Sequence, residues 1–215
     1  MSELTKLCGS KILIISFGGM GRHNGEYKFD FVTHLTNHNS NCDLIFYKDP
    51  IASWYHKGID GITTNIDETK DYINKKITSG NYEKTIFIGS SAGGYAAILF
   101  GSLCNVSNVI AFIPQTNLHD IITCTLLEHT ALNLRDILTK NSEYIDLKNI
   151  INKHTKYTLF GVHSLVDSSD IHCISHCKNI SHYKNVVIKA RKNPDIRPLR
   201  NNGQLKIILD SIINT

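Results

Sequence analysis

The sequence is organised around one stretch, Lys84-Thr-Ile-Phe-Ile-Gly-Ser-Ser-Ala-Gly-Gly-Tyr-Ala-Ala-Ile-Leu-Phe100. A β-branched and aromatic run meets Gly89-Ser-Ser-Ala-Gly93, and an apolar helical segment follows at once. This is the G-x-S-x-G pattern of a nucleophile elbow, a sharp strand-to-helix turn with a serine at its apex. Small neighbours are needed there because the apex backbone is strained and larger side chains would clash with the adjacent strand and helix.

The apex position makes Ser91 a candidate nucleophile. Its hydroxyl would stand at a helix N-terminus, where free N–H groups and the helix dipole favour developing negative charge. The rival interpretation is a Gly/Ser-rich turn of a parallel sheet, such as one that holds a phosphate. The preceding strand, the small-residue helix and Gly94 favour the elbow, and Ser90 fits the variable position of the motif.

A second glycine-rich turn follows the first expected strand. The apolar run 11–16 is typical of a strand buried on both faces, and Phe17-Gly-Gly-Met-Gly21 comes directly after it. Backbone N–H groups in such a turn can point into a cleft, as an oxyanion hole requires. We predict that the amide of Gly19 or Met20 is one donor and that of Ala92 the other. A phosphate-binding turn is disfavoured because the third glycine of G-x-G-x-x-G is missing.

Composition narrows the class of protein. A length of 215 residues suggests one domain with a sizeable core, and 41% hydrophobic and 20% charged residues are ordinary for a globular chain. The net charge of +4 comes from scattered basic residues, so nucleic-acid binding gains little support. We expect no signal peptide and no membrane span, because no stretch is apolar and long enough.

Six cysteines are spread along the chain without a disulfide framework, which favours free thiols in a reducing, cytoplasmic setting. His172, Cys173, His176 and Cys177 share helical spacing and invite a metal interpretation. They lack the two spaced Cys/His pairs of a structural zinc site, so ordinary helix packing is preferred. We therefore expect neither a metal nor a bound cofactor.

Strands alternate with helices along the rest of the chain. This order predicts an α/β fold, with residues 1–215 forming one domain on a doubly wound, mostly parallel sheet. Further strands are expected at 43–47, 108–113, 157–163 and 185–189. Helices are expected at 29–35, 66–80, 171–177 and 203–214, the second of them opening on a capping box at Asn65-Ile-Asp-Glu68.

The segment 118–153 interrupts this alternation. It has helical patches at 121–127 and 132–138, and we expect it to form a small lid or wall over the site. Predicted substrate contacts lie in turns at the carboxyl ends of strands, at Gly18, Trp54, Gln115 and His119. A lone tryptophan in such a loop can line a pocket, although a plug over the core is the commoner arrangement.

Three segments together resemble the α/β-hydrolase superfamily in its compact serine esterase or acyltransferase branch. They are Ser16-Phe-Gly-Gly-Met20, Gly89-Ser-Ser-Ala-Gly-Gly-Tyr95 and Phe160-Gly-Val-His-Ser-Leu-Val-Asp167, and their order covers nearly the whole chain. Gly93-Gly-Tyr-Ala-Ala97 and Ile113-Pro-Gln-Thr116 are similar, more loosely, to hydrolase-like proteins of bacterial and viral surface-glycan genes. The resemblance implies a triad in the order nucleophile, acid, histidine.

The resemblance places the acid in the loop after the strand at 157–163. Asp167 fits this place best, and Asp170 is a close rival. One of the two carboxylates would hold the imidazole in its productive tautomer and stabilise the imidazolium. The other would cap the helix expected at 171–177.

The histidine departs from the superfamily pattern. It is expected within residues 190–202, but no histidine follows His182. A serine hydroxyl needs a base within hydrogen-bond reach. His172 is the first candidate because it lies just beyond the acid loop, and His119 or His23 is the second, since both follow strands.

Alternatively, the chain is a weak or inactive relative, with Asn193 or Asp195 where the base would stand.

These observations predict an enzyme that moves an acyl group through an acyl-serine intermediate. Water as the acceptor would make it an esterase or deacetylase, and a sugar hydroxyl or amine would make it an acyltransferase. A transferase would need an acyl donor such as acetyl-CoA. The substrate would then be a small molecule or a glycan.

The alternative to an enzyme is a silent binding module for a glycan or protein partner, and a nucleotide-binding fold comes third. The sequence indicates no oligomeric state.

Overall fold

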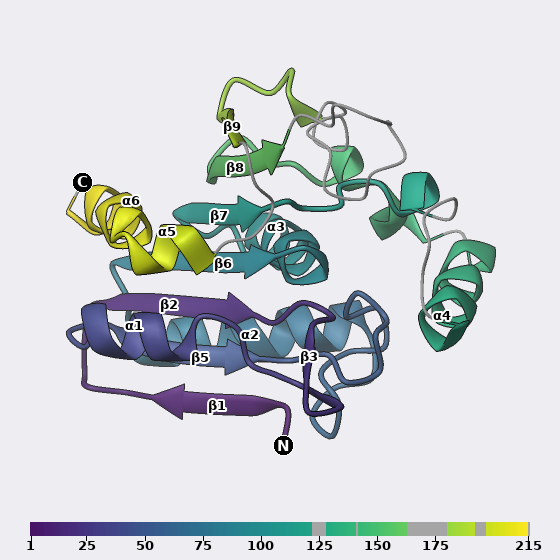
Figure 1. Ribbon diagram of the computed structural model, residues 1–215, viewed down its shortest axis with the longest axis horizontal. Helices are drawn as coiled ribbons and strands as arrows, with labels where there is room; N and C mark the ends of the chain where they lie inside the picture. The colour runs from purple at the N-terminus through teal and green to yellow at the C-terminus, as the bar shows by residue number, and fades with distance from the viewer. Residues whose placement is uncertain (122–127, 141, 163–179, 192–196, 215) are drawn as a thin grey trace.

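The computed structural model describes residues 1–121, 128–140, 142–162, 180–191 and 197–214 (Figure 1). The described residues form a seven-stranded sheet in the order β1-β5-β2-β6-β7-β8-β9. Its strands are β1 (Glu3–Lys6), β2 (Ile12–Phe17), β5 (Asp43–Tyr47), β6 (Lys84–Ser90), β7 (Asn108–Phe112), β8 (Lys156–Val162) and β9 (Val186–Arg191). Strand β1 runs antiparallel to β5, and every other neighbouring pair is parallel. The predicted mostly parallel sheet is confirmed.

Helices cover both faces of the sheet. Side chains alternate along each strand, so that Leu13 and Ile15 of β2 join one apolar cluster while Ile14 joins the other. The first cluster contains residues of α2 (Ile66–Gly80) and α3 (Ala92–Leu103). The second contains residues of α1 (Val32–His38), α5 (Arg197–Asn201) and α6 (Gln204–Ile213). The sheet is therefore doubly wound, as predicted.

The described part of the segment 118–153 is largely helical. It contains η1 (Leu118–Ile121), α4 (Glu128–Thr139), η2 (Glu143–Ile145) and η3 (Leu147–Asn149). Figure 1 shows α4 beyond the ends toward which the parallel strands point. A hairpin, β3 (Arg22–His23) with β4 (Glu26–Tyr27), follows the first glycine turn. Arg22 and Tyr27 of the hairpin each lie within 2.9 Å of His129 Nε2, which links it to α4.

One of the two hydrogen bonds of the capping box predicted at residue 65 is present. Asn65 Oδ1 accepts the N–H of Glu68 at 2.9 Å, and the Glu68 carboxylate accepts the N–H of Thr64 rather than that of Asn65. The helix then runs to Gly80 and is closed by Asn81 in the left-handed region, at φ 50°.

Several element bounds differ from the sequence predictions. The helix expected at 29–35 begins only at Val32, because Phe31 has a left-handed φ of 62° and stands at its N-cap. Strand β1 and helix α5 were not predicted: β1 is four residues long and mostly exposed, so it shows no buried apolar run. The helix expected at 171–177 and residues 122–127 of the patch at 121–127 lie outside the described residues.

Candidate active site

Ser91 occupies the turn between β6 and α3. Its φ of 55° and ψ of −122° form the strained conformation expected at the apex of the elbow. A Cβ on Gly89 would collide with the Gly93 carbonyl, and a Cβ on Gly93 would collide with the Phe17 carbonyl. The Ser91 N–H donates to the Phe112 carbonyl at 2.9 Å, which ties the turn to β7. The strand, turn and helix of the predicted elbow are therefore all present.

The first glycine turn packs directly against this elbow. A Cβ on Gly19 would lie 2.8 Å from the Ser90 carbonyl oxygen and 3.7 Å from Ser91 Cβ. The N–H of Gly18 donates to the Tyr47 carbonyl at 2.8 Å, so the turn is fixed to β5 as well. The two glycine-rich turns identified in the sequence thus meet at Ser91, as an oxyanion hole beside a nucleophile would require.

The amide of Gly19 already has an acceptor. Its N–H donates to Asp30 Oδ2 at 2.8 Å. Gly19 could serve an oxyanion only if this carboxylate gave way, so Met20 becomes the stronger candidate of the two left open by the sequence. Ala92 opens helix α3, where the N–H groups of the first turn have no intrahelical acceptor.

Gln115 reaches Ser91 from the turn after β7. Its Nε2 donates to Ser91 Oγ at 3.3 Å, and its Oε1 accepts the indole N–H of Trp54 at 2.7 Å. Both side chains are buried: Gln115 is 1% exposed and Trp54 is 0% exposed. Trp54 therefore has no exposed surface with which to contact a substrate, and it is the plug over the core that the sequence offered as the commoner alternative.

The loop that carries Trp54 is anchored by Asp49. Asp49 Oδ2 accepts the N–H of Ser53 at 2.7 Å and that of Tyr55 at 3.0 Å. Burial raises the pKa of Asp49, while these N–H groups oppose the rise. The Tyr55 hydroxyl donates to the Gly18 carbonyl at 3.0 Å, so the same loop also supports the glycine turn.

The candidate bases fall into two groups. His23 and His119 are exposed, on β3 and η1, and neither imidazole bonds to Ser91 among the described contacts. Asp167, Asp170 and His172 lie outside the described residues, as do Asn193 and Asp195. Within the described chain, Gln115 is the side chain that hydrogen-bonds the Ser91 hydroxyl. The predicted acid and base remain predictions.

One histidine that the sequence analysis did not single out, His56, contacts helix α3, the helix that follows Ser91. His56 Nε2 is 2.8 Å from the hydroxyl of Tyr95, which donates to the Tyr144 carbonyl. The Tyr95 hydroxyl has one proton, and the Tyr144 carbonyl accepts it. His56 Nε2 must therefore be protonated and donate to the Tyr95 oxygen. Burial lowers the pKa of His56 to about 4, with Lys140 adding to the effect. This imidazole is therefore neutral at physiological pH and helps to hold helix α3.

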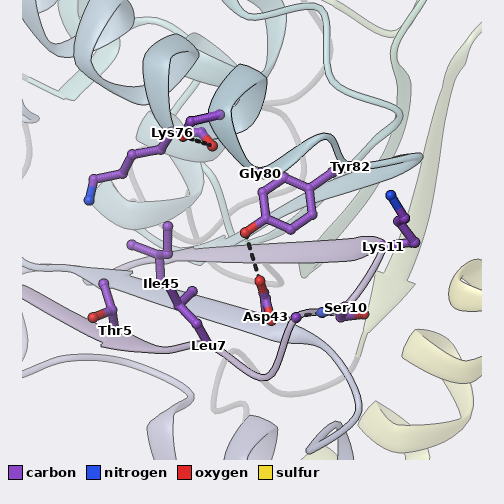
Figure 2. Close-up of a pocket in the computed structure, with 11 residues that line it drawn as sticks. Thr5, Leu7, Ser10, Lys11, Asp43, Ile45, Lys76, Gly80 and Tyr82 are labelled. Carbon is purple, nitrogen blue, oxygen red and sulfur yellow. Dashed lines mark hydrogen bonds between the residues drawn. The ribbon is translucent and has the colours of Figure 1, made fainter.

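A cavity of about 410 Å³ lies at the opposite end of the sheet (Figure 2). Its wall includes Asp43, the first residue of β5, whereas Ser91 follows the last residue of β6. The Asp43 carboxylate accepts the N–H groups of Cys8 and Ser10 and the hydroxyl of Tyr82, at 2.7, 3.1 and 2.8 Å. These bonds tie the β1–β2 turn to the sheet, so we assign this carboxylate a structural role.

The part of the chain that the structure describes contains no group of three or more His, Cys, Asp or Glu residues that could hold a metal ion. The metal interpretation of His172, Cys173, His176 and Cys177 stays untested, because these residues lie outside the described part of the chain. No described helix combines the length and apolar character needed to cross a bilayer.

No family model and no curated protein matches the chain. Solved structures do match over nearly its whole length. An α/β hydrolase from a Medee basin deep-sea metagenome library has a TM-score of 0.61 and 11% identity, covering 99% of this chain and 94% of its own. This chain has the α/β-hydrolase fold.

Two other solved structures that match this chain are an O-acetyltransferase and a serine hydrolase. The capsule O-acetyltransferase of Neisseria meningitidis serogroup A has a TM-score of 0.67 and 18% identity, covering 99% of this chain and 91% of its own. A histidine-to-alanine variant of that enzyme was determined in complex with CoA. A fluorophosphonate-binding serine hydrolase of Staphylococcus aureus has a TM-score of 0.65 and 11% identity, and the match covers 98% of this chain and 86% of the hydrolase. At these identities the likeness establishes the fold alone.

Proposed function

We propose that this chain transfers an acyl group through an ester of Ser91. The observation that carries the proposal is the Ser91 hydroxyl at the apex of a strained elbow, with the first glycine turn packed against it. Ser91 is only half-buried. The enzymes that share the fold include an O-acetyltransferase and serine hydrolases, which supports acyl chemistry at this place.

The reaction would proceed in two steps. Ser91 Oγ attacks the acyl carbon, its proton passes to the base, and the carbonyl electron pair moves onto oxygen, stabilised by the amides of Met20 and Ala92. The bond to the leaving group then breaks, and that group departs with the electron pair and the proton. An acceptor next attacks the acyl carbon while the base takes its proton, the bond between the acyl carbon and Ser91 Oγ breaks, and the base returns the proton to Oγ. We propose His172 as the base, oriented by Asp167 or Asp170.

The acceptor decides between two activities. Water would give an esterase or deacetylase, and a sugar hydroxyl or amine would give an acyltransferase fed by a donor such as acetyl-CoA. We propose a glycan as the acceptor class, which the O-acetyltransferase of the same fold supports. In this proposal the segment 118–153 forms a wall over the site, and His119 and Gly18 lie beside the substrate.

Fluorophosphonate labelling tests this proposal. The wild-type protein should gain one label at neutral pH, and peptide mass spectrometry should place the label on Ser91. The Ser91→Ala variant should not react. Ser90→Ala is the matched control, because Ser90 is the neighbouring hydroxyl and should leave the label in place. A label that survives in Ser91→Ala would contradict the assignment of the nucleophile.

A catalytically silent binding module is the second candidate, because no histidine follows β9. This candidate predicts that the wild-type protein stays unlabelled while a glycan or protein partner raises its melting temperature. Labelling of Ser91 would exclude it.

A further inference from the structure

Three strained segments converge on the Ser91 hydroxyl. Ser91 has a φ of 55°, Trp54 a φ of 51° and Ile113, two residues before Gln115, a φ of 43°. Positive φ is a genuine outlier for a β-branched residue such as Ile113. Each such residue persists only where the surroundings impose its conformation, most often at functional sites. The strain lies on the three segments that supply Ser91, Gln115 and Trp54.

The orientation of the Gln115 amide follows from its partners. The indole N–H of Trp54 can only donate, so the group facing it at 2.7 Å must be the amide oxygen, Oε1. The NH₂ group of Gln115 must therefore face Ser91 Oγ, 3.3 Å away. Because Gln115 is 1% exposed and Trp54 is fully buried, water does not compete for these groups. Trp54 thus fixes a hydrogen-bond donor on the hydroxyl of Ser91.

A donor at this place acts on the nucleophile itself. When Ser91 Oγ accepts from Gln115, its own proton is left to point elsewhere, toward a base. As that proton leaves and negative charge grows on Oγ, the bond from Gln115 becomes charge-assisted and strengthens. An interaction that is stronger in the transition state than in the ground state accelerates the reaction.

We propose that Gln115 is a catalytic residue that stabilises the developing alkoxide of Ser91, and that Trp54 is the positioning residue that fixes its amide. This replaces the substrate contact expected of both residues from the sequence. The inference rests on the proposed function, since it needs Ser91 to be the nucleophile. It differs from that proposal in naming a donor to Oγ itself, distinct from the amides that serve the carbonyl oxygen.

The rate of labelling by a fluorophosphonate measures this effect. In that reaction the Oγ–P bond forms, the P–F bond breaks with release of fluoride, and the hydroxyl proton goes to the base. Gln115→Glu keeps the acceptor for Trp54 and, when its carboxyl is ionised, lacks the donor, so labelling at a pH where it is ionised should slow about 10-fold or more. Gln115→Met removes the donor without adding charge and should also slow it. Trp54→Phe should cost less, about 2- to 5-fold, because an untethered amide still presents a donor part of the time.

The pH profile separates this role from a structural one. Gln115 uses both ends of its amide on Ser91 and Trp54, so the pH of half-maximal labelling should stay at the wild-type value in Gln115→Met and Trp54→Phe, which add no charge. Tyr157→Phe is the matched control, because it removes a buried hydroxyl that bonds Ser102 in the core. It should lower the melting temperature without changing the labelling rate.

The outcomes separate this inference from the proposed function. Wild-type labelling of Ser91 with unchanged rates in folded Gln115→Glu and Gln115→Met would overturn the role of Gln115 alone. A shifted pH midpoint in Gln115→Met or Trp54→Phe would overturn it too, since neither variant adds a charge and the shift would mean that the base had moved. Absence of labelling in the wild-type protein would overturn both proposals. If the Gln115 variants do not fold, a wild-type rate in Trp54→Phe overturns the positioning step.

Discussion

At the scale of single residues, the site requires glycine at Gly89 and Gly93, where a Cβ atom would collide with neighbouring backbone. The backbone of Ser91 is strained, which costs about 1–3 kcal/mol, and it is held by the Ser91 N–H on the Phe112 carbonyl and by the glycines on either side. The elbow and the strand before the first glycine turn approach closely at Gly93, where an added Cβ would lie 2.1 Å from the Phe17 carbonyl oxygen. The requirement for glycine is steric there and does not arise from a positive φ.

A methyl group at Gly93 should therefore destabilise the protein strongly. We expect Gly93→Ala to lower the free energy of unfolding by about 3 kcal/mol or more, because backbone must move to admit the new Cβ. Urea unfolding measures the loss. Gly21→Ala is the control, since its Cβ would meet only the end of the Lys28 side chain, at 3.7 Å. Equal losses in the two variants would contradict this account.

At the scale of elements, turns at the two ends of the sheet have different tasks. The turns after β2, β6 and β7 bring Gly19, Ser91 and Gln115 together. At the other end, Asp43 at the start of β5 collects three hydrogen bonds and fixes the turn between β1 and β2. Burial alone would raise the pKa of Asp43, but the bonds from Cys8, Tyr82 and Ser10 together hold it below its usual value.

This carboxylate should make stability depend on pH in the acid range. Its pKa is lower in the folded than in the unfolded chain, so its contribution is present above the unfolded value of about 4 and is lost as pH falls through the folded value. Urea unfolding between about pH 2 and pH 5 should show a steeper loss in the wild type than in Asp43→Asn. Identical pH slopes would refute the role of Asp43.

At the scale of the whole molecule, the described part of the segment 118–153 packs on the folded core. Leu134 and Ile137 of α4 and Leu147 of η3 are buried in the same apolar cluster as helix α3. Asn133 Nδ2 donates to the Ile51 carbonyl at 2.6 Å, which ties α4 to the loop that carries Trp54. These contacts hold α4 and η3 against the rest of the fold. That the segment forms a lid or wall over the site stays a prediction, as does the assignment of residues 1–215 to one domain.

Shortening one buried and one exposed leucine side chain of α4 tests this packing. Leu134→Ala should lower the free energy of unfolding by about 2–5 kcal/mol, because it opens a cavity in the core. Leu132→Ala, on the same helix but 57% exposed, should change it by less than about 0.5 kcal/mol. Urea unfolding of the two variants gives the comparison. A small loss in both would show that α4 is not packed on the core in solution.

Much of the architecture could be predicted from the sequence. Apolar runs such as 11–16 and 43–47 predict buried parallel strands, and the glycines around Ser91 predict the elbow, because local sterics and burial decide these features. Short exposed elements could not be predicted in this way. Strand β1 and the β3–β4 hairpin have no buried apolar pattern, and they form through pairing with residues that the local sequence does not reveal.

The sequence by itself therefore determined the α/β architecture and the place of Ser91, because periodicity and glycine spacing act within a few neighbouring residues. Only the tertiary structure decided what meets that hydroxyl. Gln115 and Trp54 lie 24 and 61 positions from their partners, and Asp30 takes the amide of Gly19. Such contacts depend on how strands and turns are brought together in space, and no local pattern encodes the acceptor that a buried donor will find.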